Sequence, residues 1–291
     1  MRPSEGRAPP SPLRLHRDYW RRDTLKRYSD PMTYTDDDVA EMQDRLDEWL
    51  DRESALTNGL FRLQLQSAHA KEMMTHGVCR RLSDLKHGLR RVFEILPPRE
   101  AAPSREAIWD ATAFLQAFVI NVFGVMDNLA WLWRLEADVR GGNGQPLQRN
   151  RIGLTPDNVD LRGSLSAATQ AYLRGTDAWF DYLEEYRHAL AHRIPLYIPP
   201  KQLDDVAADE FARLEAEVGA PGWDWARWPE VLAAQRALGM FEPVMMHSYG
   251  EAARPVHFHG QMVCDFATVI EVAEHILTDL QARRVPAVPV N

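Results

Sequence analysis

Apolar residues recur at helical spacing through the first hundred residues of the chain. Thr35 precedes three aspartates, a pattern in which a hydroxyl caps a helix and acidic groups follow at its positive end. The helical spacing continues to about Leu96, with a break expected near Asn58-Gly59, and two prolines end it. These residues predict one long helix or two shorter helices in this part of the chain.

The next helical pattern is the most apolar part of the chain. It starts after Ser104, which can cap it, and runs to about Val139, where two glycines follow. Its middle is apolar on nearly every face, which is typical of a helix at the centre of a bundle. The most apolar run, residues 111–126, contains polar side chains and is too short to cross a bilayer. We therefore expect a buried core helix over residues 105–139 and no membrane span.

Two further long helices complete the predicted bundle. One starts at Ser164 or Ser166, after a loop rich in Gly, Asn and Arg over residues 140–163, and runs to about His192. The other covers residues 263–280, with its apolar side chains on one side. The chain is therefore predicted to be all-α, a helical bundle of four to five long helices.

Residues 200–260 form a helical and irregular insertion between the last two long helices. It contains two shorter amphipathic patterns, over residues 211–218 and 229–238, and residues 244–246 and 256–258 predict a short hairpin. Three tryptophans lie between the amphipathic patterns, and we interpret them as core residues, with a partner-binding surface as the alternative. They are Trp223, Trp225 and Trp228.

Charge is unevenly distributed along the chain. The formal net charge is −8, which argues against a protein that coats nucleic acid along its whole surface. Residues 1–28 hold eight Lys or Arg and three Asp or Glu, so they carry +5 and the rest of the chain carries −13. We expect a flexible basic arm over residues 1–33 and a single helical domain over residues 34–291. Two distant cysteines, Cys79 and Cys264, and the lack of an apolar signal segment near the first arginines predict a cytoplasmic protein.

The candidate chemistry is concentrated at the end of helix 165–192. Arg187, His188, His192 and Arg193 lie within seven residues, shortly before Pro195. A guanidinium can bind a phosphate through two hydrogen bonds, and an imidazole can transfer a proton near neutral pH. Five residues of regular helix turn through roughly 500°, so Arg187 and His192 point about 140° apart. They can reach one ligand only if the helix unwinds near its end or if the ligand spans two subunits.

Polar residues on helix 105–139 are candidate partners of this motif. The two long helices, 105–139 and 165–192, are expected to pack antiparallel. Asn121 and Asn128 lie on one side of the first of them, and Asp127 is adjacent. Polar groups in so apolar a helix cost free energy unless they are hydrogen-bonded. We expect the arginine and histidine of the motif to supply those hydrogen bonds.

With these residues the chain resembles the HEPN superfamily, helical bundles marked by Arg, a polar residue, three to five further residues and His near the end of a long helix. Arg187, His188 and His192 fit that pattern, and the resemblance covers residues 105–195 and 263–280. It implies a metal-independent endoribonuclease without a cofactor, often a toxin or antiviral defence effector, that forms a homodimer with one cleft built from both copies. The insertion and the acidic charge depart from the family pattern.

The resemblance implies a role for each residue of the motif. His192 would transfer the proton of the RNA 2′-hydroxyl or of the leaving oxygen, and Arg187 would stabilise phosphate charge. Asp127 or Asn128 would orient these groups, and Arg193 and the basic arm would hold flanking phosphates. A regulatory protein partner is a further expectation.

Two other functions remain open on the sequence alone. One is a non-catalytic HEPN-like module that binds RNA or protein. The other is a metal-binding bundle, because Glu184, His188 and His192 recur every four residues, and Asp127 or Glu136 could complete such a site. A second pair of possible metal ligands, His257 and His259, is predicted on alternate residues of a strand.

Overall fold

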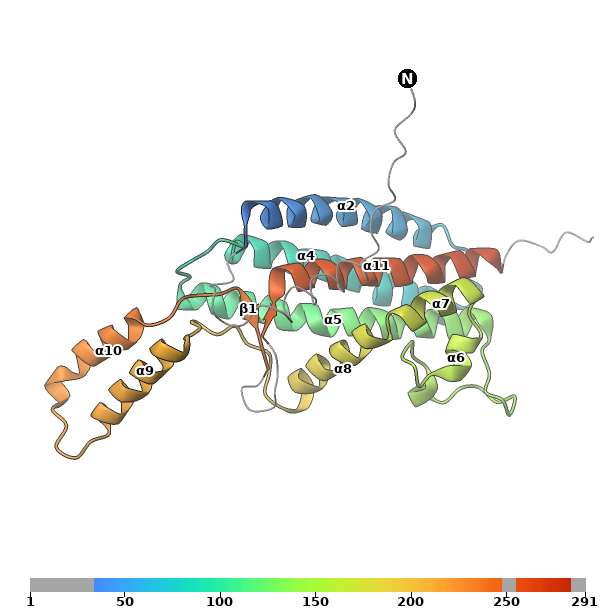
Figure 1. Ribbon diagram of the computed structural model, residues 1–291. Helices are drawn as coiled ribbons and strands as arrows, with labels where there is room; N and C mark the ends of the chain where they lie inside the picture. Colours follow the sequence, from blue (N-terminus) through green and yellow to red (C-terminus); the bar gives the residue numbers. More distant parts are fainter. Residues whose placement is uncertain (1–33, 248–254, 284–291) are drawn as a thin grey trace, which may run out of the picture.

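Helix α11 (Phe258–Ala282) occupies the centre of the fold. The computed structural model describes residues 34–247 and 255–283. Within these residues α11 contacts α2 (Asp36–Phe61), α4 (Arg80–Ile95), α5 (Arg105–Ala137) and α7 (Ala167–Gly175), and it lies between α2 and α5 in Figure 1. Most of its side chains are buried. The predicted all-α bundle is confirmed, whereas the predicted arm lies outside the described residues.

The N-terminal helix begins and ends for identifiable reasons. Thr35 accepts a hydrogen bond from the backbone of Asp38, whose carboxylate accepts one in return, so the predicted cap is a capping box. The break comes later than predicted, because Asn58 and Gly59 are still helical. A Cβ on Gly59 would lie 2.7 Å from Leu277, so this glycine allows two helices to approach closely rather than ending one.

A π-helix, η1 (Met73–Cys79), joins the short α3 (Ala68–Glu72) to α4 without interruption. The sequence pattern did not predict it. It packs against α5, and a Cβ on Gly77 would lie 2.8 Å from the side-chain carbon of Asn128. The wider turn and the missing side chain together leave room for that amide at the helix interface. Such π-turns are frequent at functional sites.

Helix α5 begins at the predicted cap, Ser104, and ends at Ala137, two residues before the predicted end. Asp138 follows in the left-handed conformation, with φ 46°. Among the described residues, α5 is the one helix long and apolar enough to cross a membrane by length and composition. It contacts α4, η1, α11 and α8 (Asp177–His192), so it lies within the bundle, although α11 occupies the central place predicted for it.

The predicted helix over residues 165–192 is two helices, α7 and α8. They meet at Thr176, whose hydroxyl donates to the Leu173 carbonyl and whose backbone leaves the helical region. The predicted antiparallel packing on α5 is confirmed at both ends. Gln116 donates to the Leu196 carbonyl just after α8, and Trp133 donates to Ser164 just before α7.

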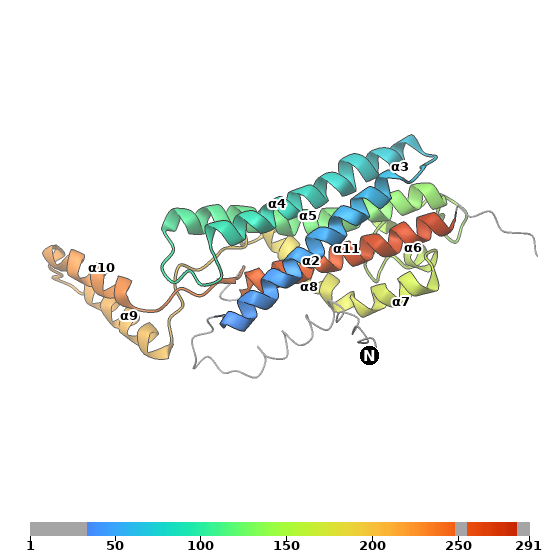
Figure 2. The same ribbon diagram turned by 90° about the horizontal axis from the view of Figure 1, so that it is seen from above.

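The insertion forms a helical hairpin that projects from one end of the bundle (Figures 1 and 2). Its helices are α9 (Asp205–Val218) and α10 (Trp228–Ala237), which pack on each other through Leu214 and Val231. Trp225 is 69% exposed and Trp228 is 39% exposed, so the core interpretation is wrong for these two. The hairpin projects from the bundle, and within the described residues both side chains stay exposed.

Short strands connect the hairpin to the bundle. Gln202 pairs with Met240, and β1 (Val244–Met245) pairs antiparallel with β2 (Val256–His257), as predicted. The turn expected at residues 248–250 lies outside the described residues. α11 then starts at once, five residues before the predicted start of the last helix.

Candidate functional site

Arg187 and His192 lie on different sides of α8. The helix stays regular to its end at His192, so it does not unwind to bring the two side chains together. The Arg187 guanidinium carbon lies 4.4 Å from the centre of the Phe123 ring on α5, a cation–π contact. The His192 ring is exposed, and its centroid is 6.3 Å from that of His188. A ligand bound by one copy therefore meets one of the two groups.

Asp127 is half-buried on α5 between two arginines. Burial raises the pKa of its carboxyl, while Arg187 and, more weakly, Arg81 on α4 lower it. The structure thus places Asp127 near Arg187, as the sequence led us to expect. The carboxylate and the guanidinium form no direct ion pair, so each keeps hydrogen-bonding capacity for a ligand.

The two asparagines of α5 pair with Arg81, which the sequence reasoning missed. Its Nε donates to Asn128 Oδ1 at 3.0 Å, and its Nη1 donates to Asn121 Oδ1 at 2.7 Å. The expectation that Arg187 and His192 bind these amides is therefore wrong, because α4 packs on that side of α5. A signal was present in the sequence. Arg81 stands at an apolar position of the helical pattern, three residues after the buried Val78 and four residues before the buried Leu85.

The remaining motif residues lie at the exposed end of α8. Glu184 Oε1 is 3.7 Å from His188 Nε2, and Arg193 is exposed at the helix end. Within residues 34–247 and 255–283, no three His, Cys, Asp or Glu side chains are grouped as metal ligands. The donor geometry of the Glu184/His188/His192 alternative is therefore incomplete.

His257 and His259 are buried and do not share a strand. His257 ends β2, and His259 lies in the first turn of α11, where a ring nitrogen is 2.6 Å from the Leu96 carbonyl. The Tyr34 ring contacts both imidazoles edge to face. Burial lowers the pKa of His257 to about 4 and that of His259 to about 3, so both are neutral at physiological pH.

A buried carboxylate, Asp265, connects α11 to α8. Its Oδ1 accepts hydrogen bonds from Trp179 Nε1 at 2.9 Å and Gln261 Nε2 at 2.7 Å. Burial raises its pKa to about 7, despite these two donors. Nearby on α8 the Tyr186 ring stacks edge to face against His247. The cluster is enclosed and better suited to packing than to binding a polymer.

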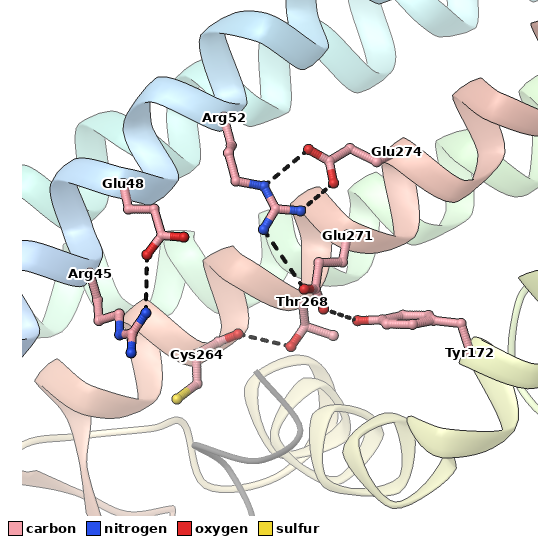
Figure 3. Close-up of polar contacts among 8 residues, drawn as sticks. All are labelled: Arg45, Glu48, Arg52, Tyr172, Cys264, Thr268, Glu271 and Glu274. Carbon is pink, nitrogen blue, oxygen red and sulfur yellow. Dashed lines mark hydrogen bonds and ion pairs between the residues drawn. The ribbon is translucent and has the colours of Figure 1, made fainter. Parts of the chain in front are cut away.

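A second polar cluster lies between α2, α7 and α11 (Figure 3). Arg52 binds Glu274 with two nitrogens and lies 3.9 Å from Glu271. Glu271 also accepts a 2.6 Å hydrogen bond from the Tyr172 hydroxyl. The charged groups are paired within the protein, so this cluster connects three helices and leaves little capacity for a ligand.

Comparisons with protein-family models, with curated proteins and with solved structures find no match to this chain. The candidate site is therefore defined by its own residues. It comprises the end of α8, the half-buried polar side of α5 and Arg81 of α4.

Proposed function

We propose that this protein is a cytoplasmic, metal-independent endoribonuclease of the HEPN type that acts as a toxin or antiviral defence effector. The observation that supports the proposal best is that the motif at the end of α8 combines one packed arginine with exposed histidines. Arg187 lies against Phe123 beside Asp127, and His188 and His192 are exposed at the end of the same helix. Phosphate binding and proton transfer are the two abilities that RNA cleavage at a 2′-hydroxyl requires.

The proposed reaction uses no group from outside the protein and RNA. His192 accepts the proton of the 2′-hydroxyl, and the freed oxygen attacks the adjacent phosphorus. The bond from phosphorus to the 5′-oxygen breaks, and a protonated imidazole gives that oxygen a proton. The products are a 2′,3′-cyclic phosphate and a 5′-hydroxyl. Arg187 stabilises the charge that develops on the phosphate oxygens, and Asp127 orients Arg187.

Because Arg187 and His192 of one copy point in different directions, the proposed site requires two copies of the chain. Because α8 is regular, one phosphate can contact Arg187 of one copy and His192 of a second copy. That His192, protonated when it takes the 2′-hydroxyl proton, then gives a proton to the leaving 5′-oxygen, so each site uses one Arg187 and one His192. Asn128 supports this site indirectly, through Arg81.

The test is cleavage of a mixed RNA pool in the presence of a chelator, with analysis of product ends. His192→Ala should lower the rate by at least about a hundredfold, the usual contribution of a general acid or base. Arg187→Lys keeps the charge but loses the two-pronged geometry, and should also impair cleavage strongly. His188→Ala should lower the cleavage rate less than His192→Ala does. His87→Ala changes an exposed histidine on α4 and serves as the matched control.

Wild-type protein that leaves RNA intact would favour the second candidate, a non-catalytic module that binds RNA or protein. The observation behind that candidate is the projecting hairpin, which exposes Trp225 and Trp228 with ring centroids 6.4 Å apart. Aromatic residues of this kind are enriched at protein interfaces. The same surface would suit a regulatory partner of an active enzyme.

A further inference from the structure

The guanidinium of Arg81 lies directly on the backbone of α5. A Cβ on Gly124 would be 2.5 Å from its central carbon, so only glycine leaves the space that the guanidinium fills. Asn121 and Asn128 flank it on either side along the helix and accept hydrogen bonds from Nη1 and Nε. Arg81 is therefore held in one position by two neutral amides.

The charge of Arg81 is not neutralised by these contacts. A guanidinium has five N–H donors, and the hydrogen bonds to the two asparagines use two of them. Neither Arg81 nor Arg187 forms an ion pair with an acid in the described part of the chain. Arg162, by contrast, donates to Asp177 at 2.6 Å and is neutralised. Both unpaired arginines are half-buried, where unbalanced charge is costly.

The two arginines reach α5 from different neighbouring helices. Arg81 comes from α4 and Arg187 from α8, and both attract the carboxylate of Asp127 between them. Two guanidinium groups and one carboxylate leave a net charge of about +1, which matches one phosphodiester. The helix surface under Arg81 is formed by Gly124 and the amides of Asn121 and Asn128, so the guanidinium itself lies close to α5.

We infer that Arg81 and Arg187 form a two-arginine clamp across α5 that binds a backbone phosphate of single-stranded RNA. The inference rests on the proposed function and adds Arg81, Asn121 and Asn128 to its substrate-binding site. Arg81 binds the phosphate, and the two asparagines position Arg81. Planar guanidinium groups held in fixed positions are well matched to phosphate oxygens.

The experiment measures binding of a fluorescent single-stranded RNA whose 2′-hydroxyls are methylated, so that cleavage cannot occur. Affinity is followed between about 50 and about 200 mM salt. Arg81→Gln should reduce the magnitude of the slope of log affinity against log salt by about 0.7, the value for one lost phosphate contact on a single strand. Arg90→Gln is the matched control, because it lies about 180° around α4 from Arg81 and should leave the slope unchanged.

A second variant separates binding from folding. Asn128→Asp keeps the acceptor for Arg81 but adds a negative charge that neutralises the guanidinium. The thermal midpoint should be equal or higher, while the salt slope falls as in Arg81→Gln. Wild-type slopes in both variants would overturn the clamp and leave the proposed function intact. Wild-type protein that neither binds nor cleaves RNA would overturn both.

Discussion

The guanidinium of Arg187 lies 4.4 Å from the ring centre of Phe123, and this contact determines which way α8 presents its motif. The arginine faces the bundle, and His192, five residues later on a regular helix, faces elsewhere. The same contact explains how a positive charge is tolerated at a half-buried position without an ion pair. It also makes the cooperation of two copies a requirement of the proposed reaction.

A mixing experiment tests that requirement. Arg187→Ala and His192→Ala should each be inactive alone, but a one-to-one mixture that exchanges subunits should recover about one quarter of wild-type activity. Half of the dimers are then mixed, and each mixed dimer holds one intact site of two. The measurement is the rate of RNA cleavage after co-refolding. No recovery would show that both groups act from the same copy.

Gly124→Ala tests the packing of Arg81 on α5. Alanine favours the helix by about 1 kcal/mol, but its Cβ would displace the guanidinium and break two charge-assisted hydrogen bonds worth about 1.5 kcal/mol each or more. We expect a net loss of about 2 kcal/mol in the free energy of unfolding, measured in urea. In an Arg81→Ala background the same substitution should be stabilising. If it lowers the free energy of unfolding there too, the described contact between Arg81 and Gly124 is contradicted.

Asp265→Asn should change how stability depends on pH. The folded pKa of about 7 lies above the ordinary value of 3.8, so the folded state binds more protons between these values and stability falls as pH rises from 4 to 7. Asparagine keeps the acceptor for Trp179 and Gln261 and removes the charge. The variant should therefore be more stable than wild type at pH 8, by a few kcal/mol at most, and similar at pH 4.5. Equal stability at pH 8 would show that the carboxylate is solvated.

The buried histidines, His257 and His259, predict that stability falls as the solution becomes acidic, the opposite of the trend for Asp265. Their pKa values of about 4 and about 3 lie below the ordinary value of 6.5, so the folded state binds fewer protons and stability falls as pH falls below 6.5. His259→Gln keeps a donor for the Leu96 carbonyl and cannot become charged. Its thermal midpoint should fall less steeply between pH 6.5 and pH 4.5 than that of wild type. An identical pH profile would place the imidazole in contact with water.

The projecting hairpin should be removable without loss of the bundle. Its helices bury Leu214 and Val231 against each other, and Gln202 and Met240 already exchange two backbone hydrogen bonds where it begins and ends. Replacing residues 203–239 by Asn-Gly should close that pair with a two-residue turn. The thermal midpoint of the bundle should stay within a few degrees of wild type. A large drop would mean that the hairpin contributes to folding of the core.

The sequence predicted those parts of the structure that depend on local chemistry. Thr35, Ser104 and Ser166 cap helices because a side-chain oxygen and the backbone amides it binds are neighbours in the chain. The position of Arg81 could not be predicted in this way. It depends on which of two helices packs on the asparagine side of α5, and on a π-turn with no marker in the spacing of apolar residues.

Whether Arg187 and His192 converge likewise depended on tertiary structure. Their spacing was visible in the sequence, but whether the last turn unwinds is decided by the packing of the chain after it. Tyr197 pairs with Met246 and the Leu196 carbonyl binds Gln116, so the segment is anchored beyond Pro195 and the turn before it remains helical.

The central position of α11 has a consequence during protein synthesis. This helix follows in the chain the four helices with which it makes most of its contacts, so the ribosome completes it after them. Until then α2, α4, α5 and α7 keep exposed the apolar side chains that α11 later covers. Partly made chains with exposed apolar surface are prone to aggregate and are bound by chaperones. The apolar surface of these helices is therefore exposed until α11 is made, and during that interval aggregation competes with folding.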